Sequence, residues 1–170
     1  MPRIVKFKGT PLTLIGKQAK VGKRAFDFKL ISQDLKIVKL SDFKDKIKII
    51  NFFPSLDTPV CDLQVKEFNQ RAAKLSPDIV IIGVSKDLPF AQARFCSVNE
   101  IKNEIVLSDY RFSSFGLNYG LLIKELNLLA RGTIIIDQSQ RIRYIQIVDE
   151  ITHSVNFEEV FSALADLLKA

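Results

Sequence analysis

The stretch Ile47-Lys-Ile-Ile-Asn-Phe-Phe-Pro-Ser-Leu-Asp-Thr-Pro-Val-Cys61 joins two predicted elements of this 170-residue chain. Residues 47–53 form a nearly unbroken apolar run, which is typical of a strand buried on both faces. Pro54 ends this strand, because proline has no N–H to donate to a sheet. The residues Asp57-Thr-Pro59 follow, and these residue types commonly begin a helix. The pattern therefore predicts a strand that leads directly into a helix.

Apolar residues then recur at the spacing of one helix face, at Cys61, Val65, Phe68, Ala72 and Leu75. Cys61 therefore falls in the first turn of the helix, on its inward face, just beyond the end of a buried strand. Ligand sites of open α/β sheets lie at such strand ends. A second apolar run over residues 79–85 predicts a neighbouring parallel strand, so the region is a βαβ unit with a right-handed crossover.

Two opposing effects act on a thiol at the position of Cys61. Burial raises the pKa of a thiol, whereas a helix N-terminus and nearby cations lower it. A free cysteine is also often a small, inert core residue. Position alone therefore leaves two interpretations open, a reactive thiolate and a structural core residue.

The rest of the chain predicts further strands and helices. Residues 4–7 and 12–15 form an N-terminal hairpin through Gly9-Thr-Pro11. Short strands are expected at residues 26–31, 37–40 and 105–107, with a capped turn at Ser41-Asp-Phe43. Leu88-Pro89 opens a helix that carries Cys96. A second hairpin is expected from residues 132–136 and 142–148.

A final helix follows, with Ser154 or Asn156 as its cap and Glu158 and Glu159 in its first turn, where the helix dipole favours anions. Its predicted buried stripe consists of Phe157, Val160, Phe161, Leu164, Leu167 and Leu168. A short aromatic segment, with Phe112, Phe115, Leu117 and Tyr119, belongs either to the core or to a subunit contact. The order of elements is consistent with a thioredoxin-like α/β fold, with a central mixed sheet flanked by helices.

Length and composition are those of an ordinary globular protein. A chain of 170 residues, 47% of them apolar, is expected to form a single domain over residues 1–170. No apolar run approaches the roughly 20 residues that span a bilayer, and the N-terminus lacks the apolar segment of a signal peptide. We therefore expect a cytoplasmic protein with no membrane partner. Two cysteines in that reducing compartment indicate transient redox chemistry rather than a structural disulfide.

The net charge of +6 makes nucleic-acid binding a candidate function. The basic residues are dispersed, however, and their two loose groups are not interleaved with aromatic residues. These groups are Lys17, Lys20, Lys23 and Arg24, and Lys44, Lys46 and Lys48. We interpret both as solvated faces and expect no nucleic-acid partner. His153 is the only histidine, and the cysteine spacing does not fit a zinc site, so we interpret His153 as a surface residue.

Arg131 lies immediately before the predicted buried strand at residues 132–136. An arginine is always ionised, and burying it is costly unless it is paired. The apolar residues on both sides of Arg131 favour a functional role over the alternative, a surface arginine at the mouth of a strand.

The motif Pro54-x-x-x-Thr58-x-x-Cys61 resembles the active-site signature of the peroxiredoxins, thiol-dependent peroxidases with a thioredoxin-like fold. The longer string Asn51-Phe-Phe-Pro-Ser-Leu-Asp-Thr-Pro-Val-Cys61 is similar to the thiol peroxidase subfamily. Further matches are Leu88-Pro-Phe-Ala-Gln-Ala-Arg-Phe-Cys96, Leu129-Ala-Arg131 and Val148-Asp-Glu-Ile-Thr152. They span nearly the whole chain, and the resemblance also implies the N-terminal hairpin.

The resemblance implies a role for each residue of the motif. Cys61 is the thiolate that attacks the peroxide, and the Thr58 hydroxyl supports the sulfur and the substrate oxygen. Arg131 stabilises the thiolate and the transition state. Pro54 shields the thiolate from water and from bulk reductants.

The resemblance also implies how the catalytic cycle is completed. Cys96 matches the resolving cysteine of the thiol peroxidase subfamily, so the sulfenic acid on Cys61 would condense with it to an intramolecular disulfide. Thioredoxin would then reduce this disulfide by thiol exchange. No organic cofactor or metal is implied, the substrates are hydrogen peroxide and organic hydroperoxides, and family analogy suggests a homodimer.

Two alternative functions come from other classes. The first is a peroxide-sensing redox relay, in which the same thiolate passes its oxidation to a partner protein. The second is a basic nucleic-acid-binding module. A thioredoxin-type oxidoreductase is disfavoured, because the chain has no Cys-x-x-Cys motif. The chain departs from the family pattern at Ser154-Val-Asn-Phe157, where relatives often carry a turn resembling Pro-Asp-Tyr.

Overall fold

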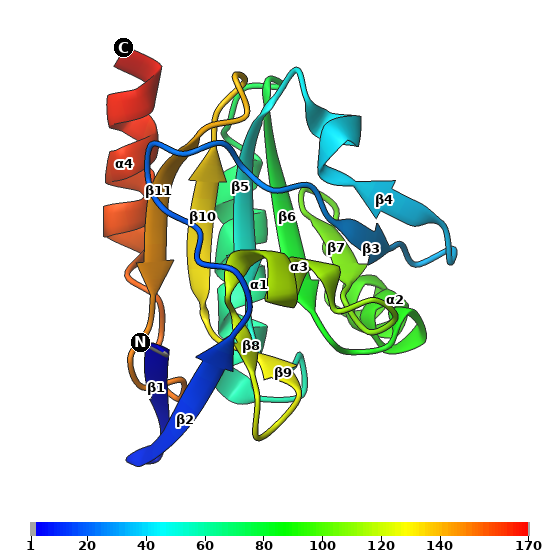
Figure 1. Ribbon diagram of the computed structural model, residues 1–170. Coiled ribbons are helices and arrows are strands. Elements are labelled where there is room, and N and C mark those ends of the chain that lie inside the picture. Colours follow the sequence, from blue (N-terminus) through cyan, green and yellow to red (C-terminus); the bar gives the residue numbers. More distant parts are fainter. Residues whose placement is uncertain (1–2, 170) are drawn as a thin grey trace.

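A computed structural model describes residues 3–169, and its centre is a mixed seven-stranded sheet (Figure 1). The strand order is β11 (Ile142–Ile147), β10 (Gly132–Ile136), β5 (Ile47–Phe52), β6 (Ile79–Ser85), β7 (Ile105–Ser108), β3 (Lys29–Ile31) and β4 (Ile37–Lys39). Strands β5, β6 and β7 are parallel, while β10 and β11 are antiparallel to their neighbours. The predicted mixed sheet is confirmed.

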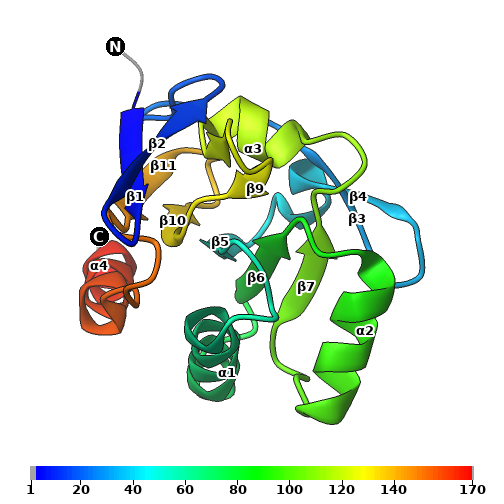
Figure 2. The ribbon, with the colours of Figure 1, turned by 90° about the horizontal axis from the view of Figure 1, so that it is seen from below.

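Helices cover both faces of this sheet (Figure 2). One face carries α1 (Pro59–Ala72), α2 (Pro89–Val98) and α4 (Phe157–Lys169). The other face carries α3 (Ser114–Tyr119) and a second sheet of four strands. Every residue of β5 is buried, as expected for a strand covered on both faces. The predicted βαβ unit is confirmed, because α1 joins the parallel strands β5 and β6.

The second sheet contains the predicted N-terminal hairpin, β1 (Arg3–Phe7) and β2 (Thr10–Ile15). Its other two strands, β8 (Leu122–Ile123) and β9 (Leu128–Leu129), were not predicted. Each has only two residues, which is too short to show an alternating pattern. β2 pairs with β8, so the hairpin is fixed to the body of the protein beside the start of β10.

Several predicted boundaries change. The strand expected at residues 26–31 begins only at Lys29, and Leu40 starts a short 3₁₀ helix, η1 (Leu40–Phe43), in place of the predicted turn. Asn156 caps α4, since its Oδ1 accepts the Glu159 N–H at 3.0 Å. Leu168 was wrongly assigned to the buried stripe of α4, because it lies in the last turn and is 56% exposed.

The aromatic segment divides between the core and the surface. Phe115 and Tyr119 are buried and stack with their ring centroids 5.0 Å apart. Phe112 and Leu117, in contrast, are 44% and 38% exposed. The segment therefore contributes to the core through the inward side of α3 only.

The interpretation of Lys48 as a solvated residue is wrong. Its side chain is completely buried on the α3 face of β5, and Nζ donates to the Asp137 carbonyl at 3.0 Å and to Gln140 Oε1 at 3.2 Å. Burial lowers the pKa of this amine to about 8. The β10–β11 turn supplies acceptors that a charged group needs in the interior, and a count of basic residues cannot reveal them.

A second buried ionisable group lies on the opposite face, where Asn51 Nδ2 donates to Glu104 Oε1. Glu104 is 6% exposed, and burial raises the pKa of its carboxyl to about 8. A Cβ on Gly83 would lie 2.8 Å from this carboxyl, so the glycine makes room for it. Glu104 is therefore protonated in the folded protein at neutral pH.

We predict that this carboxyl makes stability depend on pH. In the unfolded chain Glu104 ionises near its ordinary pKa of 4.5, but in the folded chain only near 8. The contribution of this carboxyl to the free energy of unfolding is fully present below pH 4.5 and is lost as the pH rises toward 8. The Glu104→Gln variant should therefore gain stability relative to wild type across this window, by at most about 1.4 kcal/mol per pH unit.

Urea unfolding at several pH values measures this difference, with Glu100→Gln, at an exposed glutamate, as the control. A difference between Glu104→Gln and wild type that stays constant with pH would contradict the prediction.

Candidate active site

Cys61 lies in the first turn of α1 and is completely buried. Thr58 is the N-cap of this helix, and its Oγ1 accepts the Cys61 N–H at 3.4 Å. The Thr58 hydroxyl also donates to the Ser55 carbonyl at 3.2 Å, which closes the loop that follows Pro54. The sulfur is thus held at the positive end of a helix dipole, where a thiolate is favoured.

Arg131 reaches Cys61 although the two residues are 70 positions apart. Gly132 pairs with Phe52 across β10 and β5, so Arg131 lies opposite the end of β5, where the chain turns toward α1. Its side chain is 2% exposed, and Nη2 lies 3.0 Å from Cys61 Sγ. Antiparallel pairing of β10 with β5 therefore brings Arg131 next to Cys61, two candidate site residues that are distant in the sequence.

Gln64 completes the site and was missed in the sequence. Its Oε1 accepts from Arg131 Nη1 at 3.0 Å, and its Nε2 donates to the carbonyls of Phe52 and Gly132 at 3.2 and 3.4 Å. The available signal was a polar residue three positions after Cys61, next to the apolar face of the helix. Gln64 thereby fixes the guanidinium to both strands and to α1.

The third partner of Arg131 comes from the segment after β11. Arg131 Nε donates to the Ile151 carbonyl at 2.9 Å. The preceding residue, Glu150, accepts the backbone N–H groups of Lys8 and Gly9 at 3.1 and 2.8 Å. The bond from Gly9 contributes most to lowering the pKa of the Glu150 carboxyl, which falls to about 2. The N-terminal hairpin is thus attached to the segment that orients the arginine.

A cavity of about 410 Å³ opens beside the thiol. Its polar side chains are those of Lys8, Ser55, Thr58, Arg131 and Thr152, and the remaining wall is apolar. It is lined by Phe7, Lys8, Pro54, Ser55, Thr58, Pro59, Val60, Leu126, Leu128, Arg131, Ile151 and Thr152. The structure therefore brings Pro54, Thr58 and Arg131 to one cavity, and two of these residues, Thr58 and Arg131, contact the buried Cys61.

Cys96 lies elsewhere in this region, on α2. Both cysteines are free, and both pack in one apolar cluster with Phe53, Leu56, Val65, Ile101 and Val106. Cys96 Sγ accepts from Gln33 Nε2 at 3.4 Å, and burial raises the pKa of its thiol. Cys96 lines a separate cavity and does not share the Arg131 and Thr58 contacts of Cys61. The two thiols therefore lie in different environments.

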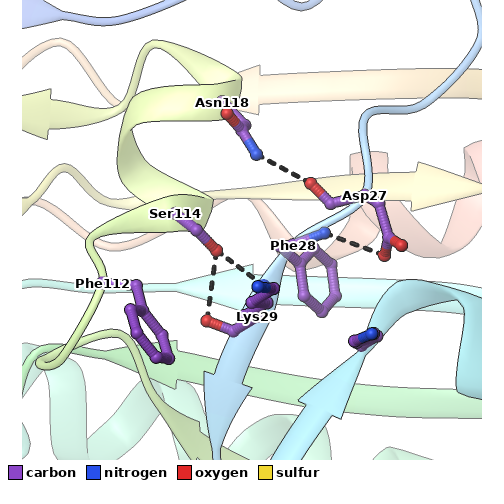
Figure 3. Close-up of a pocket in the computed structure, with 7 residues that line it drawn as sticks. Asp27, Phe28, Lys29, Phe112, Ser114 and Asn118 are labelled. Carbon is purple, nitrogen blue, oxygen red and sulfur yellow. Dashed lines mark hydrogen bonds between the residues drawn. The ribbon is translucent and has the colours of Figure 1, made fainter.

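Another cavity of about 410 Å³ lies between β3 and α3 (Figure 3). Several of its polar groups bind one another. Ser114 Oγ accepts from the Lys29 N–H at 2.6 Å and donates to the Lys29 carbonyl at 3.1 Å, and Asn118 Nδ2 donates to the Asp27 carbonyl at 2.8 Å. We interpret these contacts as the attachment of α3 to the edge of the sheet.

Residues 3–169 contain no cluster of three or more histidine, cysteine or acidic side chains placed to hold a metal ion. They also contain no helix that is both long and apolar enough to cross a bilayer.

Comparison with known proteins gives consistent results. A family model described as Redoxin matches residues 20–164. The chain is 44% identical over 165 residues to a thiol peroxidase from Bacillus subtilis, covering 97% of this chain and 98% of that protein. It is also 44% identical over 160 residues to a thiol peroxidase from Streptococcus pneumoniae, covering 94% and 98%.

Solved structures agree with the fold. A peroxiredoxin-like protein from Aquifex aeolicus superposes with a TM-score of 0.91 at 40% identity, covering 97% of each chain. A thiol peroxidase from Chromobacterium violaceum gives 0.86 at 20% identity, covering 98% of this chain and 97% of that one, and supports the fold alone. The predicted thioredoxin-like fold is confirmed.

We predict that Gln64 controls the reactivity of Cys61 through Arg131. In Gln64→Leu the guanidinium loses an acceptor, and a hydrogen bond to a charged group contributes about 1.5–3 kcal/mol. Alkylation of Cys61 by iodoacetamide, measured in a Cys96→Ser background, should slow by roughly tenfold if about half of that contribution reaches the thiolate.

Gln140→Leu is the matched control, because the Oε1 atom of Gln140 also accepts from a buried cation, Lys48 Nζ at 3.2 Å, but in the β10–β11 turn away from Cys61. If Cys61 is alkylated at the same rate in both folded variants, Gln64 does not control its reactivity.

Proposed function

The chain belongs to the Redoxin family and is a peroxiredoxin-type thiol peroxidase, and from this premise we propose that Cys61 is its peroxide-attacking thiolate. The observation that carries the proposal is the 3.0 Å contact between Arg131 Nη2 and Cys61 Sγ at the start of α1. A guanidinium at this distance favours the ionised sulfur, and the thiolate is the nucleophilic form.

In the first step, the Cys61 thiolate attacks one oxygen of a hydroperoxide. A sulfur–oxygen bond forms, the O–O bond breaks, and the leaving oxygen takes a proton to become water or an alcohol. Negative charge moves from the sulfur to this oxygen, so donors are needed at both atoms. Arg131 can serve the sulfur, and the N–H of Val60 in the first helical turn can serve the oxygens.

Thr58 and Pro54 assist this step in different ways. The Thr58 hydroxyl donates to the Ser55 carbonyl in the resting structure, and by rotating it can donate to the bound peroxide instead. Pro54 forms part of the apolar wall and limits the access of water to the sulfur. The apolar lining from Phe7, Leu126 and Leu128 also suits organic hydroperoxides, beside hydrogen peroxide.

In the second step, the Cys96 thiol attacks the sulfenic acid on Cys61. A disulfide forms, the S–O bond breaks, and water leaves with the proton of the thiol. Membership of both cysteines in one apolar cluster supports this pairing. Because Cys61 and Cys96 belong to separate helices, we infer that α1 and α2 loosen locally when the bond forms. A dithiol reductant, thioredoxin by family analogy, then restores both thiols by exchange.

Family analogy suggests a homodimer, and exposed apolar residues at α2 suggest where its subunits meet. Leu88, Phe90 and Val98 are 53%, 67% and 74% exposed, and large exposed apolar patches are typical of contact surfaces. We propose that this surface contributes to a homodimer, and that the single-domain protein acts in the cytoplasm, where both thiols stay reduced. The redox-relay alternative is not favoured, because the relatives that match nearly the whole chain at 44% identity are thiol peroxidases.

Removing Arg131 should slow the first step specifically. The loss of a donor to developing charge costs about 2–4 kcal/mol, so Arg131→Ala should oxidise Cys61 roughly thirty- to a thousandfold more slowly. Stopped-flow measurement of Cys61 oxidation tests this step alone, with Arg143→Ala as a control at an arginine paired to Asp137 away from the thiol. If Cys61 is oxidised at the wild-type rate in Arg131→Ala, then Arg131 has only a structural role.

The two cysteine variants should fail at different steps. Cys61→Ser should abolish turnover, because serine is neither ionised nor a comparable nucleophile. Cys96→Ser should react once with peroxide and then stall as sulfenic acid, becoming prone to over-oxidation. Mass spectrometry after one equivalent of peroxide should show a Cys61–Cys96 bond in wild type and added oxygen in Cys96→Ser. Full thioredoxin-linked turnover by Cys96→Ser would exclude Cys96 as the resolving residue.

A further inference from the structure

Asp87 follows β6 and accepts hydrogen bonds from three donors. Its Oδ1 accepts from Ser55 Oγ at 2.9 Å, and its Oδ2 accepts from the Leu56 N–H at 2.8 Å and from Ser85 Oγ at 2.6 Å. Ser55 and Leu56 belong to the loop between Pro54 and Thr58, which leads into Cys61. A side chain outside the motif therefore holds that loop in place.

The backbone of Asp87 is fixed just as firmly. Its carbonyl accepts from Ser108 Oγ at 2.5 Å, at the end of β7, and its N–H donates to Ser85 Oγ at 3.3 Å. Ser85 Oγ also accepts from Gln92 Nε2 at 3.1 Å, and Gln92 lies on α2. One continuous network thus connects the loop before Cys61 to the helix that carries Cys96.

Direct packing between the two segments is incomplete. A cavity of about 200 Å³ lies between the loop residues Leu56 and Asp57 and the α2 residues Ala91, Arg94, Phe95 and Val98, and Asp87 forms part of its wall. Side chains do not fill this space, so the hydrogen bonds that run from the loop through Asp87 and Ser85 to Gln92 supply a connection between loop and helix there.

We propose that Asp87 is a positioning residue that restrains the loop before Cys61 against α2, and so sets how fast oxidised Cys61 leaves the folded site to form the disulfide. This inference rests on the proposed peroxidase cycle, in which both helices must loosen before the sulfurs can meet. With the restraint intact, the folded site persists for reaction with peroxide. With the restraint removed, the loop opens more often and Cys96 reaches the sulfenic acid sooner.

The chemistry of the contact requires a carboxylate. Three donors converge on Asp87, and a carboxylate offers acceptors on both oxygens. An asparagine retains one acceptor oxygen and turns an NH₂ group toward at least one donor. Asp87→Asn therefore breaks the connection with almost no change in volume, which separates the hydrogen bonds from packing.

The test is a single-turnover experiment on the full chain with three readouts: the rate of Cys61 oxidation, the rate of disulfide formation, and the yield of sulfinic acid as peroxide is raised. In Asp87→Asn we expect disulfide formation to accelerate by roughly tenfold, the order expected when a hydrogen bond to a charged group is lost. The peroxide concentration that gives half over-oxidation should rise by the same factor. Oxidation of Cys61 should change by less than about threefold, because Arg131 and Thr58 remain in place.

Two further variants keep the result interpretable. Ser55→Ala removes the bond to Oδ1, together with the bond from the Asp57 N–H to Ser55 Oγ inside the same loop, and keeps the other two bonds to Asp87. It should accelerate disulfide formation by a smaller factor, even if Asp87→Asn folds poorly. Asp137→Asn is the control, because Asp137 accepts the N–H groups of Ser139 and Arg141 in the distant β10–β11 turn. It should leave the disulfide rate unchanged.

Disulfide formation that is unchanged or slower in both Asp87→Asn and Ser55→Ala would overturn the proposed restraint while leaving the peroxidase cycle intact. A wild-type protein that forms no Cys61–Cys96 bond would overturn both. The wild-type measurement therefore distinguishes the two failures.

Discussion

The guanidinium of Arg131 is the group on which the site depends. It is almost completely buried, and a buried guanidinium needs acceptors for its N–H groups. Its partners come from α1, through Gln64 and Cys61, and from the Ile151 carbonyl after β11. The arginine itself precedes β10. Three segments that are distant in sequence must therefore fold together before the sulfur acquires its neighbouring cation.

The surrounding structure serves to hold these three segments. β5 and β10 pair so that Gly132 opposes Phe52, and a Cβ at Gly132 would lie 2.0 Å from the Gln146 carbonyl. Only a glycine lets β10 lie this close to β11 directly after Arg131. The hairpin, through Glu150, holds the Ile151 segment. Lys48 shows by contrast that burial of a cation does not by itself make a reactive site, because its partners are carbonyl oxygens rather than a thiol.

Much of this arrangement could be predicted from the sequence, for physical reasons. The apolar run before Pro54 and the helix signals at Thr58 and Pro59 are local, so β5, α1 and the place of Cys61 at their junction follow from them. Partners across the sheet were not predictable in the same way. Gln64 and Lys48 are polar residues whose burial depends on acceptors from β5, β10 and the β10–β11 turn. The two-residue strands β8 and β9 depend on tertiary pairing, because β8 pairs with the distant β2 and β9 pairs with β8.

The central proposal is that the contact with Arg131 stabilises the thiolate form of Cys61. The most direct measurement is the ultraviolet absorbance of the thiolate at neutral pH in Cys96→Ser, where Cys61 is the only thiol, compared with the same protein carrying Arg131→Ala. The account predicts a larger thiolate absorbance in the first protein than in the second. Equal absorbance in both folded proteins would contradict it.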